Sequence, residues 1–323
     1  MMDGGPLMSQ KLDYIVFGVP RSGTTAVARY LNCVNEVHCG VECFGYGVDH
    51  SNIFAPDAFI NNPFYPSNES SLKYSRADIA KKGGKIAFFG NKLPKYFYRL
   101  QGVVNEIEQP KAILCYRHVE DAANSYTSRA KRDRDAWPEG HVGAYAALDM
   151  VLQLYAISQL KNAQVMVVPH AALRADWNAT MKEVVQFIAP DLDPVFREDG
   201  QRYVEKRRKI EGAKPRTKIK PHDLKVIKRI GGDDIDRVFS NGKPYMLSEI
   251  EDQIPELVAN LPKAFMKFAR NVTAKHPDPK AGDFFNEWKK KAIPAWKMLR
   301  AQRQTNENVV QPDASGHPAQ KEA

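Results

Sequence analysis

A turn near the start of the chain carries the residue types that bind a phosphate. The segment Gly18–Thr25 reads Gly-Val-Pro-Arg-Ser-Gly-Thr-Thr and joins an apolar run to an amphipathic one. A turn between a strand and a helix can aim backbone N–H groups and the positive helix end at an anion. Gly23 lets the backbone approach the anion closely, and Arg21 adds a permanent positive charge. Further hydrogen bonds can come from three hydroxyl groups, those of Ser22, Thr24 and Thr25.

This turn lacks the lysine and the metal ligand of an ATP- or GTP-binding site. Gly18 and Gly23 have the spacing of such a site, but Thr24 stands where the lysine would reach the β- and γ-phosphates. The expected strand Lys111–Tyr116 is followed by Arg117, not by an Asp that could hold Mg²⁺. We therefore expect a phosphate bound without a metal. Sulfuryl transfer suits such a site, because a sulfuryl group carries less charge than a terminal phosphoryl group.

The segments on either side of the turn are predicted to be a strand and a helix. Asp13–Phe17 is a short run of β-branched and aromatic residues that ends at a glycine, which is typical of a buried strand. Beyond the turn, apolar residues recur with the spacing of one helix face, at Val27, Tyr30, Leu31 and Val34. A strand, a turn and a helix in this order open a βαβ unit.

Strand-like and helix-like segments then alternate along the chain. The further expected strands are Glu36–Cys39, Lys85–Phe89, Lys111–Tyr116 and Gln164–Val168. The expected helices between and after them are Ala122–Lys131, Ala144–Lys161 and Asn178–Ile188. Such alternation predicts an α/β fold with three layers, α/β/α, around a parallel sheet of about five strands.

The length of 323 residues fits one enlarged domain, which we expect to span residues 1–301. Phe44–Gly84 is rich in Asn, Pro, Ser and aromatic residues and is interpreted as a long, partly irregular insertion. The part from Leu247 onward is expected to be helical. Residues 302–323 are polar and contain proline, so a disordered tail is expected there.

Two motifs together resemble those of the sulfotransferases that use 3′-phosphoadenosine 5′-phosphosulfate (PAPS). Pro20–Thr25 resembles the family's 5′-phosphosulfate-binding loop. Arg117–Ser125 resembles the 3′-phosphate motif, in which an Arg at a strand end is followed at the fourth place by Asp and at the eighth by Ser. Val119 replaces the family's usual proline. The resemblance covers roughly Asp13–Ile188 and implies a P-loop-like sulfotransferase fold, PAPS as co-substrate, and Arg117 and Ser125 as its ligands.

The resemblance also suggests which side chains catalyse the transfer. Glycan sulfotransferases carry a Glu after the second strand as candidate base and a later Lys before a Pro, and Glu42 and Lys92 fit these places. The sulfotransferases of small molecules have a His where Lys92 stands. We expect Glu42 to accept the proton of the hydroxyl group and Lys92 to stabilise the transferring sulfuryl group and the leaving phosphate. Lys95 is the rival of Lys92. The alternative bases are His38, His50, His118 and His170.

The positive charge of the chain lies in one block. Arg202–Arg229 holds twelve Lys or Arg and three Asp or Glu, which accounts for the net charge of +9. Many family members have a mobile loop over the 3′-phosphate here, so Arg207 and Lys209 are candidate ligands of PAPS. The block could instead attract an acidic polysaccharide. Its one aromatic residue, Tyr203, and the absence of a recognisable binding motif argue against a nucleic-acid partner.

The sequence therefore predicts a sulfotransferase that acts on a hydroxyl group of a glycan or glycolipid. The rings of Phe44–Tyr74 could stack on sugars or form a small local core, and both readings stay open. The alternatives are a P-loop nucleotide kinase or NTPase and a non-catalytic nucleotide-binding module. No membrane span or secretory signal is found, and the four cysteines lack metal-site spacing. A cytoplasmic protein with free thiols and no metal is expected.

Overall fold

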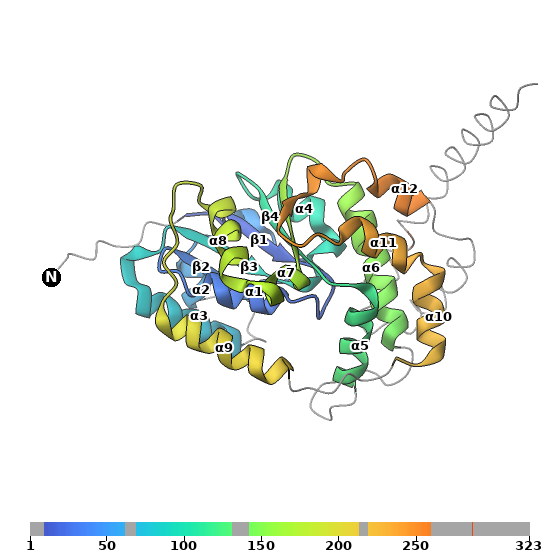
Figure 1. Cartoon of the computed structure of the whole chain (residues 1–323). Helices are drawn as coiled ribbons and strands as arrows, with labels where there is room; N and C mark the ends of the chain where they lie inside the picture. The colour runs from blue at the N-terminus through green and yellow to red at the C-terminus, as the bar shows by residue number, and fades with distance from the viewer. Residues whose placement is uncertain (1–9, 62–68, 131–141, 213–218, 260–285, 287–323) are drawn as a thin grey trace, which may run out of the picture.

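A six-stranded sheet runs through the middle of the protein (Figure 1). The computed structural model describes residues 10–61, 69–130, 142–212, 219–259 and Asn286. The strand order is β2-β3-β1-β4-β5-β6. The first five strands are parallel, and they are β1 (Tyr14–Phe17), β2 (Val37–Val41), β3 (Phe88–Lys92), β4 (Lys111–Tyr116) and β5 (Gln164–Pro169). The predicted α/β fold with about five parallel strands is confirmed.

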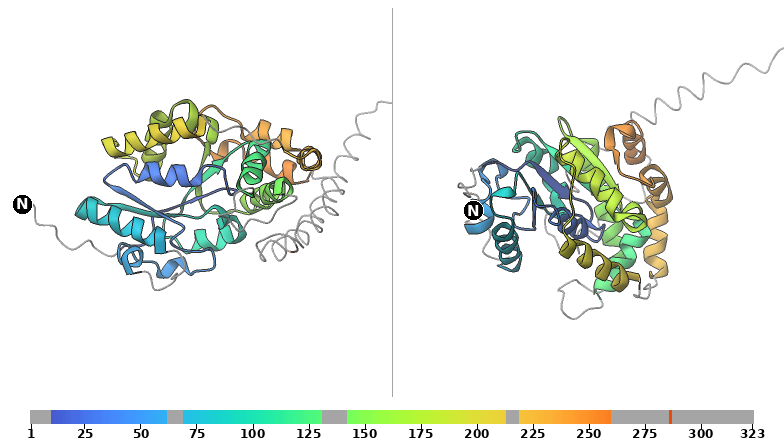
Figure 2. Two further views of the ribbon diagram at one scale, coloured as in Figure 1. Left: turned by 90° about the horizontal axis from the view of Figure 1, so that it is seen from below. Right: turned by 60° about the vertical axis from the view of Figure 1, so that its left-hand side comes forward.

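Helices cover both faces of this sheet (Figure 2). Successive residues of β1 point to opposite sides, so Tyr14 and Val16 pack into one core and Ile15 and Phe17 into the other. The first core contains α1 (Thr24–Leu31), α8 (Trp177–Ile188) and part of α9 (Glu198–Gly212). The second contains α4 (Leu100–Asn105), α5 (Val119–Ala130), α6 (Val142–Ser158), α10 (Pro221–Arg229) and α11 (Gly232–Phe239). Burial on both faces explains why β1 is apolar throughout.

The parallel strands place several predicted site residues at one edge of the sheet. Parallel neighbours end on the same side, and ligands of open α/β sheets bind beyond the carboxyl ends. The turn after β1, Glu42 after β2, Lys92 at the end of β3 and Arg117 after β4 all lie there. Chain segments far apart in the sequence are thereby brought to one place.

Strand β3 begins and ends three residues later than the predicted Lys85–Phe89. Gly83–Lys85 forms a turn of 3-10 helix, and Gly90, Asn91 and Lys92 pair with β1 and β2. Gly90, Asn91 and Lys92 are not apolar, so the apolar pattern of the sequence did not reveal that they belong to the strand. The prediction therefore placed the end of β3 too early. Lys92 is consequently part of the sheet and not of the following loop.

The insertion Phe44–Gly84 is more regular than predicted. Besides α2 (Asp57–Asn61) it contains α3 (Glu69–Lys82), which packs against β2. Buried polar groups explain why an apolar pattern did not reveal α3. Asp78 of α3 pairs with Lys82 at 2.7 Å and with His38 of β2 at 2.8 Å, so the helix is held to the sheet partly by charge.

The segment after α9 adds a strand that the sequence did not predict. β6 (Tyr245–Met246) pairs antiparallel with β5 at the edge of the sheet. The expected helical part from Leu247 begins with a 3-10 turn, Leu247–Glu249, followed by α12 (Ile254–Ala259). The remainder of that part and the predicted tail 302–323 lie outside the described residues. The domain boundary at residue 301 stays a prediction.

The described residues include no helix that is both long and apolar enough to cross a membrane. All four cysteines are free, as predicted, and the structure shows that all four are buried. Burial raises the pKa of Cys39 to about 12, and the pKa of the Cys43 thiol is raised by the same cause. These thiols are therefore protonated side chains of the core.

Candidate functional site

The predicted phosphate loop has the backbone shape that an anion-binding turn requires. Gly23 is the N-cap of α1 with φ at 104°, in the left-handed region that favours glycine. No acidic residue lies in the first turn of α1, so its positive end is uncompensated there. Pro20, Ser22 and Thr24 are buried, whereas Arg21 and Thr25 are exposed. The loop therefore combines a rigid base with two exposed side chains that can meet a ligand.

The hydroxyl of Ser22 is the clearest sign that this loop is built for a ligand. Its Oγ is buried and has no hydrogen-bond partner among the described residues. An unpaired buried hydroxyl costs about 1–3 kcal/mol, so such groups are uncommon unless something else completes them. A phosphate oxygen seated in the loop could accept this hydrogen bond. The residues present thus fit the 5′-phosphate end of a nucleotide such as PAPS.

We predict that Ser22→Ala makes the protein more stable and the site weaker. Removing the unpaired hydroxyl should raise the free energy of unfolding by about 1 kcal/mol. It should also weaken binding of adenosine 3′,5′-bisphosphate by roughly five- to tenfold, because one hydrogen bond to a charged group is lost. Urea unfolding and calorimetric titration measure the two effects. Ser128→Ala is the control, since the Ser128 hydroxyl already donates to Asn124 O at 2.9 Å, and it should give no gain in stability.

The second predicted motif lies directly against this loop. Arg21 Nε donates to Ser125 Oγ at 3.1 Å, although the two residues are 104 positions apart. Arg117 Nη1 donates to the backbone oxygen of Arg21 at 3.2 Å. Arg21 itself has a φ of 73°, an uncommon conformation for a residue other than glycine. Two guanidinium groups and a hydroxyl are thereby gathered at one point, as a clamp for a phosphate requires.

Glu42 and Lys92 form an ion pair at the same edge of the sheet. Lys92 Nζ donates to Glu42 Oε1 at 2.5 Å, and Glu42 N donates to Lys92 O at 2.7 Å. The side chain of Lys92 is 1% exposed, whereas that of Glu42 is 42% exposed. Burial lowers the pKa of Lys92, and the adjacent carboxylate opposes that shift. A buried ammonium beside an accessible carboxylate can serve as proton acceptor and charge stabiliser in one unit.

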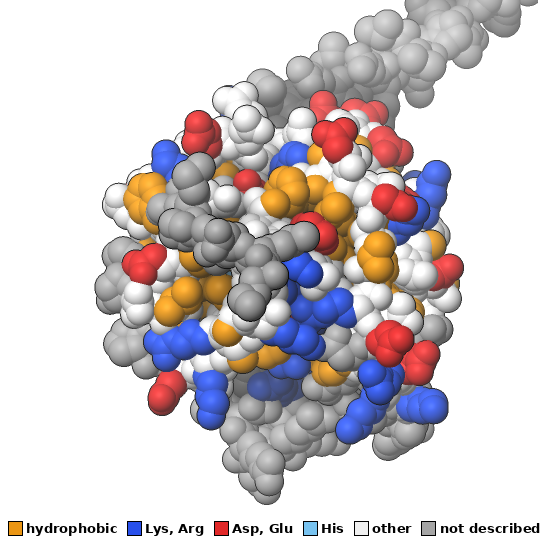
Figure 3. Space-filling model, turned by 90° about the vertical axis from the view of Figure 1, so that its left-hand side faces the viewer, with side chains coloured by type: hydrophobic (Ala, Val, Ile, Leu, Met, Phe, Trp, Pro, Cys, Tyr) orange, Lys and Arg blue, Asp and Glu red, His pale blue; other side chains and the backbone are white. Residues whose placement is uncertain are grey.

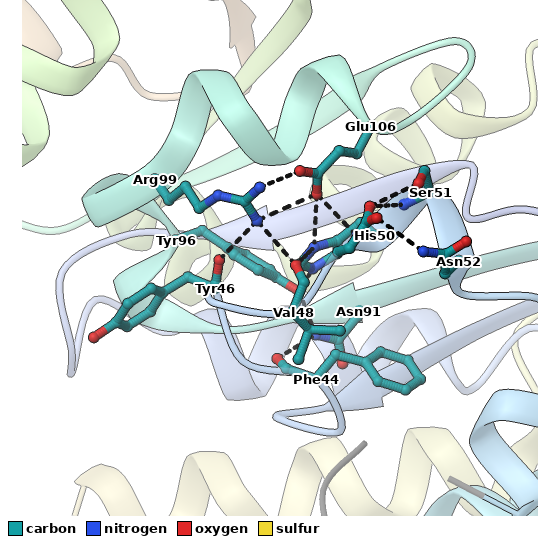
Figure 4. Close-up of polar contacts among 11 residues, drawn as sticks. Phe44, Tyr46, Val48, His50, Ser51, Asn52, Asn91, Tyr96, Arg99 and Glu106 are labelled. Carbon is teal, nitrogen blue, oxygen red and sulfur yellow. Dashed lines mark hydrogen bonds and ion pairs between the residues drawn. The ribbon is translucent and has the colours of Figure 1, made fainter. Parts of the chain in front are cut away.

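Asn91 holds the backbone that follows Glu42, and its contact with Phe44 is drawn in Figure 4. Glu42 has a φ of 59°, so its conformation must be held by its surroundings. The carboxamide of Asn91 accepts from Cys43 N and donates to Phe44 O, both at 3.1 Å. Asn91 is fully buried and directly precedes Lys92. One buried side chain thus ties the segment after Glu42 to the strand that carries Lys92.

A chain of hydrogen bonds continues from Asn91 to His50 (Figure 4). Asn91 Nδ2 donates to the oxygen of Tyr96, and the Tyr96 hydroxyl lies 3.0 Å from His50 Nε2. His50 Nδ1 lies 2.9 Å from Val48 O, which can only accept, so Nδ1 carries the proton and Nε2 accepts from Tyr96. Burial lowers the pKa of His50, which keeps the ring neutral. The network is completed by Arg99 and Glu106, which are paired with each other.

Three of the four histidines named as alternative bases contact other polar groups, and the fourth, His170, lies against the phosphate loop. Both ring nitrogens of His50 are used in the network above, and buried His38 pairs with Asp78. His118 is exposed and contacts Ser240 Oγ through Nε2 at 2.8 Å. His170, the first residue of α7 (His170–Ala175), lies against Gly23 of the phosphate loop. Burial and the nearby Arg117 lower the pKa of His170 to about 4, so it faces the loop as a neutral ring.

We predict that the protein loses stability as pH falls from about 6.5 toward 4. A neutral His170 with a pKa of about 4 protonates in the unfolded chain first, near pH 6.5. Its contribution is therefore complete above pH 6.5 and is lost on acidification, by roughly 2 kcal/mol between pH 7 and 5. Urea unfolding at both pH values measures the loss. His170→Gln should show a smaller loss, and an equal loss would contradict the assignment.

The remaining predicted site residues are Lys95, Arg207 and Lys209. Lys95 Nζ lies 6.0 Å from the centre of the Tyr98 ring. Arg207 and Lys209 belong to α9, so this part of the basic block is helical and not a loop. Lys209 is exposed, and the side chain of Arg207 lies outside the described part. Lys and Arg side chains do gather near the middle of the face shown in Figure 3.

The aromatic side chains of the insertion mainly form a local core. Phe44 and Phe59 are fully buried with ring centres 4.9 Å apart, and Phe59 also stacks on Phe89. Phe54 is 44% exposed. The ring of Tyr74 lies 5.2 Å from the guanidinium of Arg29. Phe64 and Tyr65 lie outside the described residues. The suggestion that these rings stack on sugars is therefore wrong for Phe44 and Phe59.

The chain was compared with curated proteins and with solved structures. No curated protein matches the chain. Among solved structures it is similar to a sulfotransferase from Alicyclobacillus acidocaldarius, with 13% identity, a TM-score of 0.39, and 62% of this chain and 93% of that chain covered. It is also similar to sulfotransferase STF9 from Mycobacterium avium, with 11% identity, a TM-score of 0.39, and coverage of 72% and 76%. A third similar structure is the sulfotransferase domain of the Synechococcus PCC 7002 olefin synthase, at 10% identity, a TM-score of 0.37, and coverage of 72% and 98%.

The assignment itself rests on the family model. The model described as "Sulfotransferase family" matches residues 14–194, which is more than half of the chain. The matched region contains both motifs, the pair Glu42–Lys92 and all five parallel strands. Because the match covers more than half of the chain, the chain belongs to the sulfotransferase family.

Proposed function

We propose that this sulfotransferase uses PAPS as donor and transfers its sulfuryl group to a hydroxyl group. The observation that carries the proposal is the meeting of Arg21, Arg117 and Ser125 beside the phosphate loop. ATP has no 3′-phosphate, so a second phosphate-binding cluster beside the loop favours PAPS over ATP.

The donor would be held at its two phosphate-bearing ends. The loop Pro20–Thr25 would bind the 5′-phosphosulfate through backbone N–H groups and the Ser22 hydroxyl. Arg117 and Ser125 would bind the 3′-phosphate. Arg21 now donates to Ser125, so a bound phosphate would replace a hydrogen bond that the protein makes with itself. Arg207 and Lys209 remain proposed additional ligands.

Glu42 and Lys92 would carry the reaction. PAPS supplies an activated sulfuryl group, and the acceptor supplies a hydroxyl. The Glu42 carboxylate would accept the hydroxyl proton as the new S–O bond forms. The bond between the sulfur and the 5′-phosphate oxygen would break at the same time, and adenosine 3′,5′-bisphosphate would leave. The Lys92 ammonium would donate hydrogen bonds to the oxygens on which negative charge develops. Because Asn91 holds Cys43 and Phe44, the carboxylate would be presented without a loop rearrangement.

We propose a glycan or glycolipid as the acceptor. Support comes from the carboxylate–lysine pair, which is the pattern of glycan sulfotransferases, in place of the histidine of enzymes acting on small molecules. The insertion supports the proposal less than its sequence suggested, because Phe44 and Phe59 are core residues. Phe54 remains as an exposed ring that could meet a sugar face.

A transfer assay with PAPS labelled in the sulfuryl group tests both halves of the proposal. The labelled donor would be incubated with uncharged and acidic oligosaccharides, glycolipids, phenols and sterols. Transfer of label to a carbohydrate hydroxyl is the expected result. Transfer only to phenols or sterols would contradict the acceptor and leave the donor standing. No transfer to any class, combined with phosphorylation of an acceptor by Mg-ATP, would contradict the proposed reaction.

A further inference from the structure

Helix α11 lies over the turn between β4 and α5 that carries Arg117. Its Asp236 Oδ1 accepts a hydrogen bond from the Tyr116 hydroxyl and another from Val119 N, the latter at 3.0 Å. The rings of Tyr116 and Phe239 are stacked with centres 4.9 Å apart. Residues 116–119 of the turn are thus held at both ends by one carboxylate that comes from a distant part of the chain.

Arg117 stands between the two groups that Asp236 binds. Tyr116 precedes it and Val119 follows two residues later, at the first position of α5. The side chain of Arg117 then reaches Arg21 O at 3.2 Å. Its direction depends on the backbone of this turn, because no regular strand or helix includes it. A carboxylate that fixes both sides of the turn therefore also fixes where the guanidinium can point.

The environment of Asp236 shows that these contacts are specific. Its side chain is 19% exposed, whereas that of Asp234 on the same helix is 66% exposed and pairs with Arg237. Tyr116 is 1% exposed. Burial and the adjacent carboxylate raise the pKa of Tyr116 well above its ordinary value, so its hydroxyl stays protonated as a donor. A second contact secures the turn, between His118 Nε2 and Ser240 Oγ at 2.8 Å.

We propose that Asp236 is a positioning residue for the donor, which orients Arg117 toward the 3′-phosphate. The inference rests on the proposed function. Asp236 lies beyond residues 14–194, the region that the family model matches. The C-terminal segment therefore completes the donor site and does more than cover the sheet. Asp236 acts through Arg117 and need not touch the nucleotide.

Two nucleotides that differ only at the 3′ position separate positioning from folding. Adenosine 3′,5′-bisphosphate carries the group that Arg117 would bind, and adenosine 5′-monophosphate lacks it. The ratio of their dissociation constants measures the 3′-phosphate contact alone. Calorimetric titration of the full chain should give a ratio of roughly 10² for the wild type, since several charge-assisted hydrogen bonds are involved. A wild-type ratio near one would contradict the proposed function and the inference with it.

Asp236→Ala should lower this ratio about tenfold while leaving affinity for the monophosphate within about twofold. Asp236→Asn should keep most of the ratio, because both hydrogen bonds go to Oδ1 and an amide oxygen can accept them. Asp234→Ala is the matched control, a carboxylate two residues away that should change nothing. Circular dichroism and thermal unfolding would establish that each variant is folded.

Tyr116→Phe keeps the inference testable if Asp236→Ala does not fold. It removes one of the two hydrogen bonds and leaves no buried hydroxyl unpaired, and we expect the ratio to fall about threefold. An unchanged ratio in Asp236→Ala, or in Tyr116→Phe where only that variant folds, would overturn the inference. An equal loss of affinity for the bisphosphate and for the monophosphate would also overturn the inference, because it would indicate a general structural role of Asp236. A raised ratio would show that the charge of Asp236 merely repels the phosphate.

Discussion

Replacing Glu42 by Gln is expected to lower turnover by about 10²- to 10⁴-fold, the usual contribution of a general base. Gln has nearly the same shape and can still accept a hydrogen bond from Lys92, but it cannot take the proton of an attacking hydroxyl. Glu42 lies beyond β2 and is absent from the phosphate loop. Affinity for adenosine 3′,5′-bisphosphate should therefore stay within about twofold of the wild type.

Release of the bisphosphate with the best acceptor from the transfer assay would measure the turnover. Glu36→Gln provides a matched control, because Glu36 precedes β2 and so lies at the opposite end of the strand from Glu42. This control should keep full turnover. Near-normal turnover in Glu42→Gln would remove the carboxylate from the mechanism. A loss of bisphosphate affinity as large as the loss of turnover would show that Glu42 shapes the donor site instead.

Replacing Lys92 by Met should lower turnover by about 10²- to 10³-fold, as the loss of one charged donor at a transition state does. The structure indicates that this loss of turnover would not result from a loss of stability. Lys92 is buried, so Met removes the cost of burying an ammonium group. Its partner Glu42 is 42% exposed and can be solvated instead. We expect the free energy of unfolding to stay within about 1 kcal/mol of the wild type.

Single-turnover rates and urea unfolding would be measured on Lys92→Met and on Lys95→Met. Lys95 is the matched control and the competing candidate, since it lies three residues away with its ammonium near the Tyr98 ring. A large loss of rate in Lys92→Met and a small one in Lys95→Met is expected. The reverse pattern would assign the charge-stabilising role to Lys95.

The sequence was most informative where the decisive features are local. Three signals within about 20 residues predict strand β1, the turn and helix α1 in this order. They are a short apolar segment, a glycine that can adopt the left-handed φ of the turn, and apolar residues at helical spacing. The motif Arg117–Ser125 likewise spans the end of one strand and one helix. Its position against the phosphate loop was predictable because parallel neighbours end at the same edge of a sheet.

The sequence was least informative where a residue acts through a distant partner. In the sequence, Asn91 is a polar residue that follows a predicted strand. Its burial beside Cys43 and Phe44 results only from the pairing of β3 with both β1 and β2. Asp236 lies in an exposed-looking acidic helix, and its contact with Tyr116 spans 120 positions. Strand β6 has two residues and no periodicity to detect. In each case the signal exists only after the chain has folded.

The proposal that the chain binds PAPS is tested most directly by calorimetric titration with adenosine 3′,5′-bisphosphate, compared with ATP in the presence and absence of Mg²⁺. Arg21, Arg117 and Ser125 meet beside the phosphate loop, where we propose that the 3′-phosphate binds. Thr24 stands where a nucleoside triphosphatase has its lysine. We predict tight binding of the bisphosphate that does not depend on Mg²⁺, with ATP much weaker. A preference for Mg-ATP, or no binding of either nucleotide, would contradict it.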